Sequence, residues 1–238
     1  MKKQIPLFMI LILLLVGAGL YFYPDLSMLL HRMEEKQQIE TYRRHSDKLS
    51  EEEAEGMLSA AEAYNETLSE TLTTDPFQTG SEDPSASDEE YQKLLSVDGM
   101  MGYIDIPGID VYLPVGHGTS GAVLKRGAGH LYGSALPVGG EGTHSVISAH
   151  RGLPSAKLFT DLDQIKEGDI FYYHILNRTL AYQVDKIQVI EPSELGALNP
   201  EPGKDYMTLF TCTPYGVNTH LLLVRGIRVP YREEGREK

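Results

Sequence analysis

The pattern of apolar and polar positions divides the chain into three regions, and the first is a long apolar segment. Lys2 and Lys3 precede an almost unbroken apolar run from Ile5 to Tyr23. As a helix, these 19 residues would span about 28 Å, close to the thickness of a bilayer core. Because short lysine-bearing flanks stay in the cytoplasm, the pattern predicts a single-pass cell-membrane protein with a cytoplasmic N-terminus and an extracellular remainder.

A cleaved signal peptide is the alternative interpretation of this segment. Gly17, Ala18 and Gly19 are small residues of the kind found at cleavage sites. The apolar run, however, is longer than a usual signal-peptide core and continues past them to Tyr23. We therefore favour an uncleaved anchor over residues 1–24, and both interpretations export the rest of the chain.

The second region, residues 25–70, has the apolar period of helices. Ser50 and Glu53 form the pattern of a capping box, and this predicts two amphipathic helices over 27–48 and 51–70. Residues 71–88 are rich in Pro, Gly and small polar side chains, so they predict a linker or a lid. Ser87 and Glu90 then predict the cap of a short helix that ends at Leu95.

The third region, residues 101–230, changes to short β-rich runs broken by Gly and Pro. A hairpin is expected at Asn177 and Arg178, and one brief helix near residues 155–162. Seven or eight short strands over this length predict a mainly β fold, a closed or nearly closed barrel, followed by a polar tail over 231–238. The expected strands cover 102–106, 111–115, 145–149, 169–176, 179–190, 207–212 and 220–229.

The charge is as unevenly distributed as the hydrophobicity. The chain has a formal net charge of −13, and residues 25–100 alone carry −13, against +2 before them and −2 after them. The helical faces and the linker therefore account for the acidity, while the barrel is nearly neutral. Because no basic patch is visible, we expect no nucleic-acid partner.

Cys212 is the single cysteine, and it ends an apolar strand just before a Pro-containing turn. A cysteine in such a strand is often buried packing, but strand ends beside loops also display reactive groups. His150 ends another expected strand, so an imidazole is available as the proton donor that thiol chemistry needs. A zinc site is a minor alternative, because the chain has no second cysteine and its loop histidines lack tight ligand spacing. These loop histidines are His117, His130 and His144.

Four segments carry a resemblance to a known family: TLFTCTPYGVNTH around Cys212, SVISAHRGLPSAKLF around His150, GHLYGSALPVGGEGTH and GYIDIPGIDVYLPVGHGTS. Together they resemble the sortases, membrane-anchored cysteine transpeptidases of Gram-positive bacteria with an eight-stranded β-barrel. The helical extension and the triplet Asp75-Pro76-Phe77, which resembles a lid motif, are similar to class C, the pilin-polymerising branch. The resemblance thus implies residues 71–100 as lid and short helix, and 101–230 as the catalytic barrel.

The resemblance also implies a mechanism and its partners. Cys212 would attack the Thr carbonyl of an LPxTG-like sorting signal in a pilin or surface protein and form a thioacyl enzyme. A Lys amine of a pilin subunit would then resolve it to an isopeptide bond, with His150 as the general acid and base. This chemistry requires no metal or organic cofactor.

One position departs from the family pattern. Class C sortases usually carry an Arg nine residues after the cysteine, where this chain has Leu221. Arg225 is a fallback on the same strand face, but four residues of strand separate the two positions by about 13 Å; His220 should point to the opposite face. Asp75 would also lack its usual partner, so a looser lid is expected. The sequence leaves three interpretations open: a transpeptidase, with full or impaired activity, a sorting-signal-binding module with little turnover, and a hydrolase that uses the same Cys-His pair.

Overall fold

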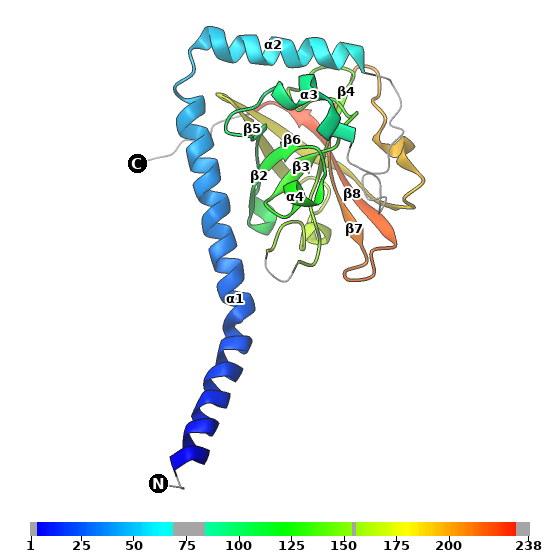
Figure 1. The fold of residues 1–238 in the computed structure, drawn as a ribbon. Helices are drawn as coiled ribbons and strands as arrows, with labels where there is room; N and C mark the ends of the chain where they lie inside the picture. Colours follow the sequence, from blue (N-terminus) through cyan, green and yellow to red (C-terminus); the bar gives the residue numbers. More distant parts are fainter. Residues whose placement is uncertain (1–3, 69–83, 154–155, 232–238) are drawn as a thin grey trace.

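The structure is a computed structural model that describes residues 4–68, 84–153 and 156–231 (Figure 1). Its first element, α1 (Gln4–Ser46), is one helix of 43 residues that runs through Pro24. The expected anchor and the expected helix over 27–48 are therefore a single element. Good helix formers follow Pro24, and the upper part of α1 packs against the barrel, so one proline does not end the helix. Within the described residues, α1 is the one helix long and apolar enough to cross a membrane.

The next helices confirm one expected cap and correct another. Ser50 and Glu53 form the predicted capping box of α2 (Glu51–Thr67), which buries Ala54, Leu58 and Ala61. The cap of α3 (Glu89–Lys93), in contrast, is Asp88, whose side chain accepts from the backbone N–H of Tyr91. Ser87 instead ends the short 3-10 helix η1 (Pro84–Ser87), which immediately precedes this cap.

The rest of the chain forms a closed eight-stranded barrel, as expected, with strand order β1-β2-β3-β4-β7-β8-β6-β5. The strands are β1 (Gly102–Ile106), β2 (Val111–His117), β3 (Ala128–His130), β4 (Thr143–Ser148), β5 (Ile170–Ile175), β6 (Arg178–Ile190), β7 (Asp205–Thr213) and β8 (His220–Val229). Short helical turns connect them: η2 (Pro107–Ile109), α4 (Gly121–Leu124), η3 (Leu162–Gln164) and η4 (Leu195–Leu198).

Three local expectations differ from the structure. Strand β3 was not predicted, because its three residues, Ala-Gly-His, show no alternation. The β5–β6 hairpin turns at Leu176 and Asn177, one residue earlier than expected, with Leu176 at φ 48°. The brief helix expected over 155–162 is replaced, in the described residues from 156 onward, by a turn and the 3-10 helix η3.

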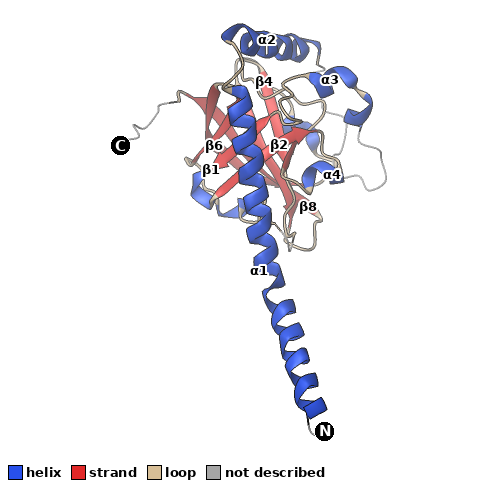
Figure 2. Cartoon of the chain, turned by 60° about the vertical axis from the view of Figure 1, so that its left-hand side comes forward, coloured by secondary structure: helices blue, strands red, loops and turns tan. Residues whose placement is uncertain are grey.

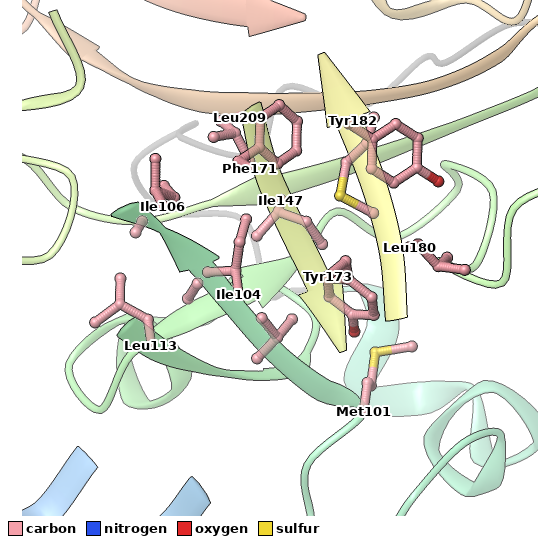
Figure 3. Packing of buried hydrophobic residues seen from close by; sticks show 14 of the residues in the cluster. Met101, Ile104, Ile106, Leu113, Ile147, Phe171, Tyr173, Leu180, Tyr182 and Leu209 are labelled. Atoms are coloured by element: carbon pink, nitrogen blue, oxygen red, sulfur yellow. The ribbon is translucent and has the colours of Figure 1, made fainter. Parts of the chain in front are cut away.

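Apolar side chains form one large cluster inside the barrel and two smaller ones outside it, one of which joins Ile39 and Tyr42 of α1 to Met100 and Tyr103. Inside, residues from all eight strands contribute to one cluster, and the rings of Phe171 and Tyr182 stack with centroids 5.6 Å apart (Figure 3). Outside, a cluster lies between the β4–β7–β8 face and the segment that follows β6, and we call it the outer cluster. It comprises Leu131, Val146, Ile190, Leu195, Leu198, Phe210, Leu221 and Leu223.

Helix α1 is fixed along one side of the barrel. The hydroxyl of Tyr42 accepts from the N–H of Leu176 at 2.8 Å and donates to the carbonyl of Met101 at 3.3 Å. Closer to the N-terminus of the helix, Arg32 pairs with Asp110 at 3.5 Å, just after β1. The apolar half of α1 extends beyond this pair and away from the barrel (Figure 2). We call the end of the barrel at Asp110 the anchor end.

Candidate active site

Cys212 and His150 lie at the same ends of two neighbouring parallel strands, Cys212 near the end of β7 and His150 two residues past the end of β4. Strand β4 pairs with β7 in a register that sets Ser148 opposite Phe210. The pairing continues past the strand end, because the N–H of Ala149 donates to the carbonyl of Phe210 at 3.3 Å and the hydroxyl of Thr211 donates to the carbonyl of Ala149 at 2.8 Å. Extending the same register by two residues sets His150 beside Cys212 on one face of the sheet.

This face is the outer one, and the thiol lies at its edge. Cys212 is partly exposed and packs against the outer cluster. Phe210, two residues earlier on the same face of β7, is fully buried in that cluster. Across the strand pair, Leu221 of β8 is directly opposite Cys212. Directly opposed side chains have Cβ atoms about 4.5–5.5 Å apart. Leu221 therefore occupies the position beside the thiol at which the sortase resemblance calls for an Arg.

The surroundings of Leu221 suit a leucine. Its side chain is 2% exposed, and β6 places Ile190 directly opposite it on the other side. Leu195 and Leu198 of the segment after β6 belong to the same outer cluster. One wall beside the thiol is thus apolar and closed to water.

His150 has a restrained backbone and a perturbed imidazole. Its carbonyl accepts from the N–H of Phe159 at 3.1 Å, which closes the loop that follows β4. Burial lowers the pKa of the His150 imidazole, and the positive charge of Lys125 lowers it further. Both effects disfavour the charged form, so His150 is mainly neutral at neutral pH and able to accept a proton.

Arg151 ties the two strand ends together, a role that the sequence analysis did not identify. Its guanidinium donates to the hydroxyl of Thr213 at 3.0 Å and to the carbonyl of Thr160 at 3.2 Å, and it pairs with Asp163 at 2.5 Å. In the Arg151–Thr213 contact, Arg151 directly follows His150 in the chain and Thr213 directly follows Cys212. The only sequence signal was adjacency to His150, because its partners lie up to 62 residues away.

Arg225 is not brought to the thiol, so the expected fallback does not hold. Its guanidinium forms a two-bond pair with Asp185, at 2.7 and 3.1 Å, and a further bond to Glu201 at 3.0 Å. It also lies over the ring of Tyr206, 4.0 Å from the centroid. These contacts hold it on the outer face four residues along β8 from Leu221.

The other residues singled out from sequence lie elsewhere. His220 is opposite Thr213, so alternation directs it to the face away from Cys212, as expected; its imidazole pairs with Glu191 at 3.2 Å. Asp75, Pro76 and Phe77, the expected lid, lie outside the described residues.

The three histidines of the zinc alternative lie in strands, not in loops as expected: His117 ends β2, His130 ends β3 and His144 lies in β4. All three hydrogen-bond to other groups. The imidazole of His117 bonds to the carbonyl of Leu94, that of His130 to Tyr91 and the carbonyl of Ala135, and that of His144 to Thr208 and the carbonyl of Asn199. In the part of the chain that the structure describes, no three His, Cys, Asp or Glu side chains gather as metal ligands would.

Comparison with known proteins gives a consistent family. The sortase domain model matches residues 104–229. Sortase C of Streptococcus pneumoniae has 46% sequence identity and a TM-score of 0.75, and the match covers 82% of this chain and 97% of that one. A pilus-related sortase C of Group B Streptococcus has 44% identity and a TM-score of 0.76, covering 81% and 97%.

Curated relatives match over a shorter segment. Sortase A of Streptococcus agalactiae is 30% identical over 117 residues, which are 48% of this chain and 47% of that protein. The chain therefore spans about half the length of the curated relatives that it matches. The domain match, the barrel and the similarity to the solved sortase C chains agree: the chain belongs to the sortase family, and it resembles class C within it.

Proposed function

We propose that the chain is a membrane-anchored cysteine transpeptidase that acts on LPxTG-like sorting signals of pilin or surface proteins. The observation that supports the proposal is the β4–β7 register: continued by two residues past Ser148 and Phe210, it pairs His150 with Cys212 at the edge of the barrel. In this proposal α1 anchors the chain with its N-terminus in the cytoplasm, and the barrel lies on the extracellular face. The pilus-related sortase C of Group B Streptococcus supports pilins as the substrate class.

The proposed reaction passes through a thioester on Cys212. His150 accepts the thiol proton, and the sulfur attacks the Thr carbonyl carbon of the sorting signal. The Thr–Gly C–N bond breaks, and the proton held by His150 passes to the departing amine. In the second half, a Lys amine of a pilin subunit attacks the thioester and gives its proton to His150. The C–N bond of an isopeptide forms, the C–S bond breaks, and His150 returns the proton to the departing sulfur, which regenerates the thiol.

A binding module with little turnover is the second candidate function, and Leu221 favours it. An oxyanion forms on the Thr carbonyl in both halves of the reaction, and each missing preorganised donor typically costs about 10²- to 10³-fold in rate. Leu221 offers no donor from this position, and Arg225 is bound to Asp185 and Glu201. Hydrolysis is a third outcome of the same chemistry, in which water replaces the Lys amine at the thioester.

Mass spectrometry of the intact protein tests the proposal. The full chain in detergent is incubated with an LPxTG-type peptide, and Cys212→Ala serves as the control. The transpeptidase and the hydrolase both predict a thioacyl adduct on the native chain that Cys212→Ala lacks, and an added Lys-containing pilin peptide separates them by the product formed. Peptide binding without an adduct, with or without acceptor, would instead support the binding module.

A further inference from the structure

Strand directions place the thiol at the anchor end of the barrel. Strand β1 runs toward Asp110, since its last residue, Ile106, pairs with Val111, and Asp110, the partner of Arg32, lies in the connection between them. Strand β2 is antiparallel to β1, β3 parallel to β2, β4 antiparallel to β3, and β7 parallel to β4. Strands β4 and β7 therefore also run toward the anchor end, and Cys212 lies at this end.

The loop that joins β7 to β8 extends beyond the thiol in the same direction. Figures 1 and 2 both show this hairpin pointing toward the side on which the N-terminal half of α1 leaves the barrel. The loop is a defined turn, because the N–H groups of Val217 and Asn218 both donate to the carbonyl of Pro214 at 3.0 Å. No residue between Thr213 and Thr219 carries a charge.

This turn presents apolar side chains to solvent. Tyr215 is 57% exposed and Val217 is 64% exposed. Among the described barrel residues, Val217 is the most exposed of the large hydrophobic side chains. An ordered, uncharged turn with an aromatic and an aliphatic side chain at its tip matches the composition of membrane-interface contacts, in which Tyr is enriched.

We propose that the β7–β8 loop rests in the interfacial layer of the bilayer that α1 spans, with Tyr215 and Val217 as its contacts. The inference rests on the membrane anchoring proposed above. Arg32, at the anchor end of the barrel, follows Tyr23 by nine residues, so it lies about 14 Å above the end of the apolar segment. The polar layer of a bilayer leaflet occupies about 5–8 Å of this, and a loop that extends two or three residues beyond Thr213 spans the remainder.

The contact also reaches the candidate active site. A Cβ atom on Gly152, where φ is +85°, would lie 2.9 Å from Cε2 of Tyr215, so the tyrosine ring packs directly on this glycine backbone. Gly152 follows Arg151 in the loop that starts at His150. A lipid contact at Tyr215 therefore braces the loop that carries the imidazole and fixes the height of the thiol above the bilayer.

Fluorescence depth measurement tests this contact directly, because the native chain contains no Trp. The full chain carrying Val217→Trp is reconstituted in nanodiscs of phosphatidylcholine and phosphatidylglycerol, with or without bromine on the acyl chains. We expect a blue-shifted emission and quenching by bromine near the carbonyl end. The matched control is Tyr231→Trp. Residue 231 follows the end of β8 at the opposite end of the barrel from the anchor end, so this variant should show neither the blue shift nor the quenching.

A third reporter separates this proposal from the anchoring on which it rests. Leu14→Trp lies inside the apolar half of α1, so bromine placed near the bilayer centre should quench its fluorescence. Quenching at residue 14 with none at residue 217 would refute the loop contact and leave the anchoring intact. No quenching at residue 14 would refute the anchoring, and the loop contact with it.

A binding experiment addresses the other occupant that an exposed apolar loop can have, a substrate peptide. Val217→Asp should abolish the lipid contact and leave the affinity for a soluble LPxTG-type peptide unchanged, as measured by fluorescence anisotropy of the labelled peptide in detergent. A several-fold loss of peptide affinity in Val217→Asp, together with an unquenched Val217→Trp, would assign the loop to the substrate and overturn the membrane contact.

Discussion

Replacing Leu221 by Arg probes the most unusual feature of the site. Since Leu221 is directly opposite Cys212, the new side chain starts about 5 Å from the cysteine Cβ, and its guanidinium lies within reach of an oxyanion on a thiol-bound carbonyl. One preorganised donor is worth about 10²- to 10³-fold in rate, or about 3–4 kcal/mol. We therefore expect thioacyl formation to accelerate by about 10²-fold.

The substitution has a cost that the structure also sets. Leu221 is 2% exposed in the outer cluster, and loss of a buried Leu side chain costs about 1.5–3 kcal/mol. The methylene stem of Arg recovers part of this contact while its charged end turns toward the partly exposed thiol. Domains are typically stable by about 5–15 kcal/mol, so the barrel should stay folded and the gain in rate should be measurable.

Single-turnover mass spectrometry with an LPxTG-type peptide measures the effect as the rate of adduct formation. Leu221→Met controls for altered packing and Leu221→Lys for a charge without the planar fork, and neither should match Arg. Circular dichroism and urea unfolding verify that each variant is folded. An adduct rate in folded Leu221→Arg no higher than in the native chain would refute the view that a missing donor limits this site.

Three further predictions concern two groups near the site and one buried histidine elsewhere in the barrel. Arg151→Lys keeps the charge but loses the planar guanidinium that joins Thr213 to Asp163, so the rate of adduct formation should fall by about 10²-fold. The control Arg178→Lys, at the surface ion pair with Glu55, should leave this rate unchanged. Equal rates in both variants would contradict a positioning role for Arg151. Lys125→Gln removes a positive charge near His150, so the pKa of His150, measured by NMR titration, should rise toward its ordinary value; an unchanged pKa would assign the shift to burial alone. His130 is fully buried, and burial lowers its pKa from 6.5 to about 4. Below pH 6.5 the unfolded chain therefore binds a proton that the folded chain does not, so the free energy of unfolding decreases as the pH is lowered. Between pH 7.5 and pH 5, the free energy of unfolding measured with urea should therefore decrease by about 2 kcal/mol less in His130→Asn than in the native chain. An identical decrease in both would show that His130 does not cause the pH dependence.

Patterns that are local in sequence predicted most of the fold. Seven of the strands follow from alternation and Gly or Pro boundaries, and the Ser50 capping box follows from a three-residue spacing. The missed features depend on partners distant in sequence. Strand β3 exists because β2 and β4 pair with it on either side, and its three small residues carry no signal of their own.

The candidate site shows the same division. The motif around each residue identified Cys212 and His150, and strand alternation correctly placed His220 on the opposite face from Cys212. Alternation also put Arg225 on the face of Leu221, but only the structure reveals the carboxylates of Asp185 and Glu201 that hold its guanidinium. The contacts of Arg151 were equally invisible, since they join loops that the sequence keeps far apart.

The continuity of α1 has a consequence for how the protein would meet a substrate. Helix α1 is clamped to the barrel through Tyr42 and continues through Pro24 into the apolar half, so no loop separates that half from the barrel. With the apolar half in a bilayer, the barrel is held at one distance from the membrane surface, and the thiol moves in a plane parallel to the membrane. Encounter with another membrane-held chain then becomes a search in two dimensions, in which lateral density of the two proteins, not their bulk concentration, sets the rate.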